Sequence, residues 1–262
     1  MLRKQTILGV DITNAKKSEV LEYITESVKK PSTKYFIETP NPEIIVYAAK
    51  HPHFRNLVNK AEISVPDGMG VMLAGVLAGK PFLERITGVD LMEALCKEGM
   101  NNAVRIGLLG AKPGVADKTA ECLRAKYPGI NIVFAAPEWP QKSIKYKVSS
   151  IKYENNEAEH ILNTKYLIPD TGIDILFIAY RYPKAEEWIS SHLDRLPVKV
   201  AMGVGGAFDY ISGNVVRAPL ILRKLGLEWL YRLFCEPWRW RRQLALVEFV
   251  VLLVKSRVIK RK

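Results

Sequence analysis

The chain has 262 residues, 48% of them hydrophobic, which is enough for one buried core with or without an appendage. Its net charge is +12, and the excess is concentrated in residues 217–262, where twelve Lys or Arg accompany three Glu. The longest apolar stretch, residues 244–254, contains Glu248 and falls well short of the roughly 20 residues of a membrane-spanning helix. The N-terminal apolar run is too short for a signal peptide, and three cysteines without CxxC spacing favour reduced thiols in a cytosolic protein.

Short apolar runs alternate with helical patterns along most of the chain. We expect strands at 6–10, 35–39, 62–65, 105–109, 130–135, 173–179 and 198–204. We expect helices at 18–29, 42–50, 70–78, 89–98, 114–127 and 184–191, the second of them started by Asn41 as cap and Pro42 in the first turn. This order predicts an α/β fold with a Rossmann-like, mostly parallel sheet flanked by helices.

Two segments depart from this pattern and set the expected domain limits. Residues 137–170 contain a proline-rich start, a basic run and an acidic run, which predicts an irregular, solvated insertion. Residues 217–262 read as a helical, basic C-terminal appendage to an α/β domain that spans 1–216. No internal repeat is visible.

The residue spacing in the appendage predicts an amphipathic helix with an apolar face and a charged face. The apolar face is formed by Leu222, Leu225, Trp229 and Leu233, and the charged face by Lys224, Glu228 and Arg232 at i,i+4 spacing. Cations beside Trp and Leu suit an anionic membrane surface, and the alternative is a helix docked on the core with an ordinary charged outer face. The basic charge also fits nucleic acid, but aromatics on an apolar face favour lipid over bases, so nucleic acid is not an expected partner.

Polar residues follow two of the predicted strands. Thr39 and Asn41 come directly after the strand at 35–39, and Asp67 follows the strand at 62–65, before Gly68 and a helix. Ligands of open α/β sheets bind outside the carboxyl ends of the strands, where an aspartate can act as a general base. An N-cap explains Asn41 equally well, and Asp-Gly is also a routine turn pair.

Glycines follow two further strands, at Gly110 and at 203–206, and Arg217 begins the basic segment. Such glycines allow close approach of a phosphate or of another segment, and an arginine can bind a phosphate bidentately. A packing turn, a bulge and a surface arginine explain the same residues. The four histidines lack metal-ligand spacing, and the sequence has no DxD motif, so neither a metal nor a cofactor is expected.

Taken together, these motifs resemble the WecG/TagA/CpsF family of bacterial glycosyltransferases, over nearly the whole chain except about 137–170. The resemblance rests on the joint order of Thr39-Pro40-Asn41, Val65-Pro66-Asp67-Gly68, Glu84-Arg85-Ile86-Thr87-Gly88-Val89-Asp90-Leu91, Leu108-Leu109-Gly110, Gly203-Val204-Gly205-Gly206-Ala207-Phe208-Asp209, Arg217-Ala218-Pro219, the stretch 223–233 and Glu236-Pro237-Trp238-Arg239. It implies an inverting, metal-independent transfer from a UDP-sugar to a polyprenyl-diphosphate-linked sugar, with N-acetylmannosamine moved to N-acetylglucosaminyl-diphospho-undecaprenol as the best-known case.

The resemblance also implies roles for single residues. Asp67 is implied as the base, with Thr39 and Asn41 shaping the pocket. Substrate contacts are implied for Arg85, Gly110, Gly205, Arg181 and Glu186. Contacts with the lipid diphosphate or UDP are implied for Arg217, Arg223 and Arg232, at the cytoplasmic face of the cell membrane, where the chain is expected as a peripheral protein. Whether the chain also pairs with a second copy of itself, as a homo-oligomer, stays open.

One segment departs from the family pattern. Where the family shows Gly-x-Pro-Lys-Gln-Glu, this chain has Arg181-Tyr182-Pro183-Lys184-Ala185-Glu186. Arg181 then either contacts phosphate in compensation, or the pocket serves another sugar, or the activity is weakened. The alternatives to the leading hypothesis are therefore transfer of another hexose for exopolysaccharide and a non-catalytic member that binds lipid-linked sugar at the membrane.

Overall fold

The computed structural model describes residues 2–140 and 172–260, so most of the expected insertion at 137–170 lies outside the described residues. Its centre is a six-stranded sheet with the order β4-β3-β8-β7-β5-β6, in which every pair of neighbours is parallel. The strands are β3 (Tyr35–Glu38), β4 (Ile63–Ser64), β5 (Arg105–Gly110), β6 (Asn131–Ala136), β7 (Ile173–Ala179) and β8 (Val198–Gly203). This confirms the predicted α/β, Rossmann-like parallel sheet.

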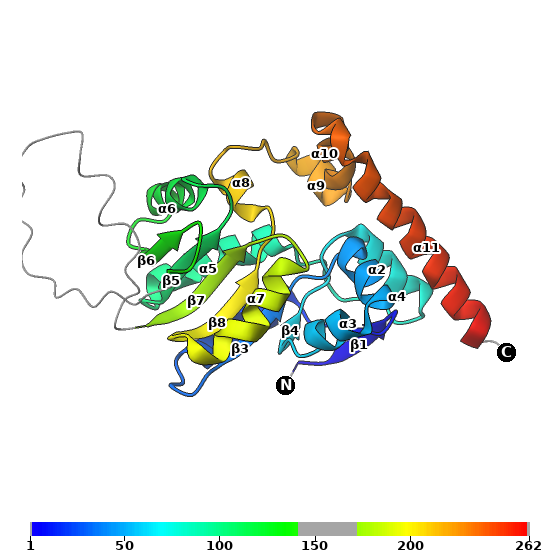
Figure 1. Cartoon of the computed structure of the whole chain (residues 1–262), viewed down its shortest axis with the longest axis horizontal. Helices are drawn as coiled ribbons and strands as arrows, with labels where there is room; N and C mark the ends of the chain where they lie inside the picture. Colours follow the sequence, from blue (N-terminus) through cyan, green and yellow to red (C-terminus); the bar gives the residue numbers. More distant parts are fainter. Residues whose placement is uncertain (1, 141–171, 261–262) are drawn as a thin grey trace, which may run out of the picture.

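Helices cover both faces of the sheet (Figure 1). One face packs against α1 (Lys17–Val28), α5 (Gly88–Asn101), α6 (Val115–Lys126) and α8 (Ala207–Ile211). The other packs against α7 (Lys184–His192), which continues into a short 3-10 turn, η1 (Leu193–Arg195). Because all strands run in one direction, their carboxyl ends and the loops that follow them share one edge of the sheet.

The expected strand at 6–10 is wrong. The chain instead forms an antiparallel hairpin of β1 (Lys4–Ile7) and β2 (Val10–Thr13), separate from the parallel sheet. Leu8 and Gly9 make the two-residue turn, and both have positive φ, of 48° and 86°. Positive φ at both residues suits a two-residue hairpin turn. Leucine is rare in such turns, so the sequence at 6–10 reads as one apolar run and does not indicate a turn.

A second cluster of apolar side chains lies beside β4, at the edge of the sheet. It joins the hairpin to α2 (Pro42–Lys50), α3 (Pro52–Val58), α4 (Met69–Leu77) and the long C-terminal α11 (Trp240–Lys260). Phe249 and Leu253 of α11 are buried in this cluster, and Arg242 forms an ion pair with Glu43 of α2 at 2.6 Å. Figure 1 shows α11 lying along this side of the molecule.

The expected single amphipathic helix from 222 to 233 is interrupted at Gly226. The chain forms α9 (Leu220–Lys224) and α10 (Glu228–Cys235), followed by η2 (Pro237–Arg239) before α11. Gly226 has a φ of 74°, and the Leu227 N–H donates to the Leu222 carbonyl at 2.8 Å, which closes α9 as a Schellman-type cap. The break separates Lys224 from Glu228, so the expected i,i+4 pair between them is replaced by a pair of Glu228 with Arg217.

Substituting Gly226 with alanine is expected to lower the free energy of unfolding by about 1–3 kcal/mol, since the methyl group meets both a positive φ and a close neighbour. A Cβ at this position would lie 1.8 Å from Cγ of Met69. Gly213→Ala is the matched control, because Gly213 has a φ of 75° with open space around it. Urea unfolding of both variants checks the prediction, and an equal loss of stability would contradict the overlap with Met69.

Among the described residues, no helix combines the length and the hydropathy needed to cross a membrane.

Candidate active site

Asp67 lies where the short strand β4 ends and α4 is about to begin. The Asp67 N–H donates to the Pro40 carbonyl at 3.2 Å, which holds the loop after β4 against the loop after β3. One carboxylate oxygen of Asp67 accepts the N–H of Gly88, the first residue of α5, at 3.3 Å. Three loops therefore converge on one half-buried carboxyl group.

Thr39 and Asn41 flank Pro40, whose carbonyl accepts the Asp67 N–H. The buried Thr39 hydroxyl donates to the Gly203 carbonyl at 3.4 Å, and a Cβ at Gly88 would lie 3.3 Å from the same hydroxyl oxygen. The Asn41 side chain caps α2 by accepting the Ile44 N–H at 3.1 Å. The capping role is thus observed directly, and contact with a substrate stays a prediction for both residues.

The surroundings of Asp67 favour a proton on its carboxyl group. Burial is the main cause that raises the pKa of Asp67 to about 7. The hydrogen bond from the Gly88 N–H favours the charged form and lowers this pKa in part. The negative charge of Glu228 raises this pKa further, and the positive charge of Arg85 opposes it. A carboxyl group whose pKa lies near neutrality is well suited to general acid–base chemistry.

Arg85 connects this centre to the C-terminal appendage. Its guanidinium donates to the backbone carbonyl of Arg223 at 2.6 Å. The Arg223 Nε is buried and has no hydrogen-bond partner among the described residues. The Arg223 backbone thus contacts Arg85, and Arg85 is the arginine whose charge acts on Asp67.

Arg217 bridges two carboxylates across the boundary between the α/β body and the appendage. It lies 2.8 Å from Asp90 of α5 and 3.1 Å from Glu228 of α10, and its side chain is 16% exposed. Burial alone would raise the pKa of Asp90, but the Arg217 charge and the Thr87 hydroxyl lower it. A guanidinium fork is well shaped for holding two carboxylates at once.

Arg232 of α10 is held in a similar way. It pairs with Glu236 at 2.8 Å, donates to the Tyr210 hydroxyl at 2.9 Å and lies over the Tyr210 ring. A Cβ at Gly206 would lie 3.3 Å from the guanidinium, so the small residue allows this approach. The loop that contains Gly205 is therefore packed beside Arg232. From the sequence, Gly205 and Arg232 were predicted as parts of two separate sites.

Gly110 and Arg181 lie at the carboxyl ends of β5 and β7, farther along the same edge. A Cβ at Gly110 would lie 3.0 Å from the Ala179 carbonyl carbon and from the Tyr180 ring, so the glycine permits close packing of these strand ends. Arg181 is exposed. Ala185 is buried in the cluster beneath α7, 2% exposed, so the departure from glutamine falls on a packed position.

Glu186 is not at the surface of the site. It is 3% exposed and shares a hydrogen bond with Glu38, which is 1% exposed, and each carboxyl group has one oxygen without another partner among the described residues. Burial and the neighbouring acid raise the pKa of Glu38 well above its ordinary range, and burial raises that of Glu186 to about 7. Two adjacent buried carboxyl groups cannot both be ionised, so the pair holds a proton.

This pair predicts a pH-dependent stability. Because the folded-state pKa values are raised, the proton stabilises the fold fully below the ordinary glutamate range, and this stabilisation is lost as pH rises toward about 7. In Glu186→Gln, the amide supplies a permanent hydrogen-bond donor. The free energy of unfolding of the wild type falls between about pH 5 and pH 7.5, and we expect the fall in the variant to be smaller by about 1–3 kcal/mol. The control is the exposed neighbour, Glu187→Gln. Chemical denaturation at several pH values tests this, and identical slopes for all three proteins would refute the shared proton.

Several participating residues were not predicted as site residues from the sequence. They are Glu38, Gly88, Asp90, Tyr210, Glu228 and Glu236. Gly88 and Asp90 belong to the stretch after Arg85 that carried the family resemblance, and this was the available signal. Glu38 gave none, because an acid at the end of an apolar strand reads as exposed.

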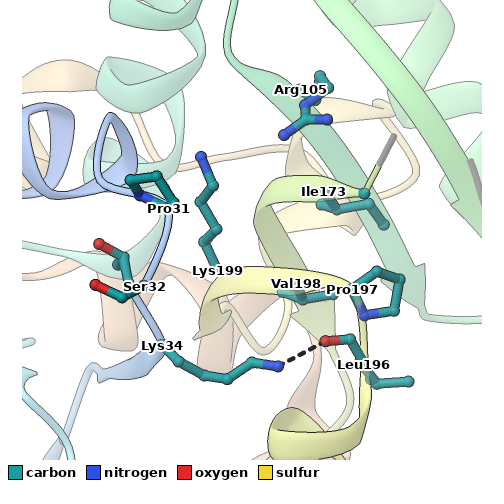
Figure 2. A pocket seen from close by; sticks show the side chains of 11 residues that line it. Pro31, Ser32, Lys34, Arg105, Ile173, Leu196, Pro197, Val198 and Lys199 are labelled. Carbon is teal, nitrogen blue, oxygen red and sulfur yellow. Dashed lines mark hydrogen bonds between the residues drawn. The ribbon is translucent and has the colours of Figure 1, made fainter. Parts of the chain in front are cut away.

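A separate hollow of about 390 Å³ lies at the opposite, amino end of β5, β7 and β8 (Figure 2). Its cations already have partners: Arg105 and Lys199 both pair with Asp174, and Lys34 donates to the Leu196 carbonyl at 2.7 Å. The convergence of loops, arginines and a carboxyl group with a raised pKa places the candidate active site at the other edge, around Asp67.

The chain is similar over nearly its whole length to proteins of one known family. Residues 5–262 match the model of the glycosyl transferase WecG/TagA/CpsF family. The chain is 34% identical over 260 residues to the N-acetylglucosaminyldiphosphoundecaprenol N-acetyl-beta-D-mannosaminyltransferase of Staphylococcus aureus strain MRSA252, covering 99% of this chain and 94% of that protein. It is 30% identical over 254 residues to the protein of the same name from Bacillus spizizenii, covering 97% and 92% of the two chains. The chain therefore belongs to the glycosyl transferase WecG/TagA/CpsF family.

Proposed function

We propose that the chain moves N-acetylmannosamine from UDP-N-acetylmannosamine to an undecaprenyl-diphosphate-linked N-acetylglucosamine, with inversion and without a metal. The observation that carries the proposal is the Asp67 carboxyl group at the carboxyl edge of the sheet, with its pKa of about 7 and the charge of Arg85 acting on it. The names of the relatives in Staphylococcus and Bacillus support the same donor sugar and acceptor.

In the proposed reaction, an acceptor hydroxyl oxygen attacks the anomeric carbon of the donor sugar. Asp67 takes the proton of that hydroxyl, which requires the ionised carboxylate. The bond between the anomeric carbon and the phosphate oxygen breaks, and its electron pair leaves with UDP. Attack opposite to the leaving group gives inversion. Thr39 and Asn41 line the pocket beside Asp67 and orient the sugar.

The departing UDP carries growing negative charge, which the arginines are placed to stabilise. Arg85 donates to the Arg223 backbone carbonyl, which holds α9 of the appendage beside the arginine whose charge acts on Asp67. Arg217 is fixed by an ion pair with Asp90 of the α/β body, and Arg232 by one with Glu236 inside the appendage. Fixed cations of this kind substitute for a metal ion when they stabilise charge at a leaving group. Gly110, Gly205 and Arg181 extend the proposed donor site along the strand ends.

We further propose that residues 217–262 act as a membrane-associating appendage of the domain at 1–216, on the cytoplasmic face of the cell membrane. Trp229, Phe234, Trp238 and Trp240 are all exposed, and the same segment carries most of the excess positive charge. Exposed aromatics beside cations suit the interface of an anionic bilayer.

A donor panel tests the reaction. The full chain is incubated with UDP-N-acetylmannosamine, UDP-N-acetylglucosamine or UDP-glucose, together with a short-chain GlcNAc-diphospholipid, and UDP release and product are measured. We expect product with UDP-N-acetylmannosamine. Product with a different donor would replace the proposed sugar, and no product with any donor would refute the enzyme assignment.

A further inference from the structure

Exposed large hydrophobic side chains are confined to two parts of the described chain. One part is the appendage and its start, residues 216–254, and the other is the short stretch 73–83 in the α/β body. The second part was not predicted as an interaction surface. It contains Leu73, Val76, Leu77 and Leu83, which are 44–62% exposed.

These side chains form a continuous outer face on α4. Val71 and Ala74 of the same helix are buried against the hairpin and α2, whereas Leu73, Val76 and Leu77 have the i, i+3, i+4 spacing of the opposite side. Leu83 follows shortly after the helix ends. Leaving four large apolar side chains in water is unusual for a surface that has no partner.

The outer face of α4 lies next to the appendage. Met69, the first residue of α4, packs against Gly226 between α9 and α10, and a Cβ at Gly70 would lie 3.8 Å from the ring of Phe249 in α11. Along α11, the exposed Val247, Val250, Val251 and Val254 lie on the side turned away from buried Phe249 and Leu253. Figure 1 shows α4 and α11 side by side on one flank of the molecule.

Positive charge borders this apolar surface. Lys80, Lys224, Arg241 and Lys255 are exposed. The nearby acids are partly engaged: Glu248 pairs with Lys50 at 2.5 Å, and Glu84 accepts the Lys17 N–H at 2.7 Å. An apolar face bordered by cations fits a bilayer with anionic headgroups. The same cations on two copies of the chain would oppose their association through this face.

We propose that α4 and Leu83 of the α/β body, together with the outer face of α11, form one surface that inserts into an anionic lipid bilayer. The inference deepens the proposed membrane association and rests on it, but it assigns the second half of the contact to the catalytic domain. Since α4 has nine residues and starts two residues after Asp67, the candidate base lies within about 14 Å of helix length from the inserted face. The surface would thus set the height of the active site above the headgroups of the lipid-linked acceptor.

The test compares two full-length triple variants. Leu73→Glu/Val76→Glu/Leu77→Glu changes the outer face of α4, and Ser18→Glu/Ala125→Glu/Ser190→Glu adds the same charge at exposed positions of α1, α6 and α7. Glutamate is a good helix former, so both variants suit their helices. Binding to vesicles of phosphatidylglycerol and phosphatidylcholine is measured by flotation. We expect the α4 variant to bind at least about tenfold more weakly than the wild type, and the control to bind within about twofold.

Further measurements separate the outcomes. Equal vesicle binding by the two variants would overturn the proposal. It would also be overturned if light scattering showed that the α4 substitutions change the oligomeric state while vesicle binding stays the same. If circular dichroism shows that the α4 variant is unfolded, Leu83→Glu replaces it, because Leu83 lies outside the helix. Activity on a water-soluble acceptor should be unchanged in the α4 variant, while activity on a vesicle-embedded acceptor falls in proportion to binding. A chain without any transferase activity would refute the proposed function, and the vesicle binding would still decide the role of α4.

Discussion

Replacing Asp67 with asparagine is expected to lower kcat by about 10³-fold, because the amide keeps the shape of the side chain but cannot accept the acceptor's proton. The Gly88 N–H that Asp67 accepts has an oxygen acceptor in asparagine as well, so the loops around the site should stay in place. The KM for the donor should change little, since the proposed contact is with the acceptor hydroxyl. Steady-state kinetics with the short-chain acceptor gives both constants.

The pH profile provides the second measurement on Asp67. Its pKa is about 7 in the fold, and the active form is the carboxylate, so kcat/KM of the wild type should rise with pH and level off above about 7. The residual activity of Asp67→Asn should lack this rise. A variant that retains most of its activity, or that keeps the same acid limb, would show that another group is the base.

Replacing Arg217 with alanine is expected to reduce kcat/KM by about 10²-fold and to lower the free energy of unfolding by about 2 kcal/mol. The substitution leaves Asp90 and Glu228 without the cation that both contact. Their negative charges already raise the pKa of Asp67, so the acid limb of the pH profile should move to higher pH. Arg217→Lys should recover only part of the activity, because an ammonium group cannot reproduce the guanidinium fork.

Arg195→Ala is the control for Arg217, since it removes the same charge from an exposed position in η1. Its activity and stability should equal those of the wild type. Thermal unfolding and the pH profile of kcat/KM separate the two roles of Arg217. A variant that is destabilised but keeps the pH profile of the wild type would show that Arg217 acts only as a structural bridge.

The sequence predicted the fold well where local signals and burial agreed. The helix at 42–50 and the strand at 173–179 have the observed limits, because Asn41 with Pro42 marks a helix start and an unbroken apolar run marks a strand buried on both faces. The hairpin at β1 and β2 was missed, since Leu8 carries an uncommon backbone conformation that its residue type does not announce.

The candidate site was predicted one residue at a time, and its connections were not. Asp67, Thr39 and Asn41 do gather at one edge because parallel strands end together. Ion pairs such as Arg217 with Asp90 join segments far apart in the chain, and no local spacing encodes them. Glu186 was predicted as a substrate contact, and only the packing of α7 on the sheet reveals that it lies against Glu38.

The ion pairs of Arg217 and Arg232 have a consequence for the selectivity of the proposed site. Arg217 and Arg232 are already neutralised by Asp90, Glu228 and Glu236, so an incoming anion competes with carboxylates rather than with water. A single phosphate or a chloride ion gains little from such an exchange, whereas a diphosphate can engage several guanidinium groups together. If the proposed site holds the diphosphate here, we expect the resident carboxylates to keep small anions out and to keep the cations preorganised between turnovers.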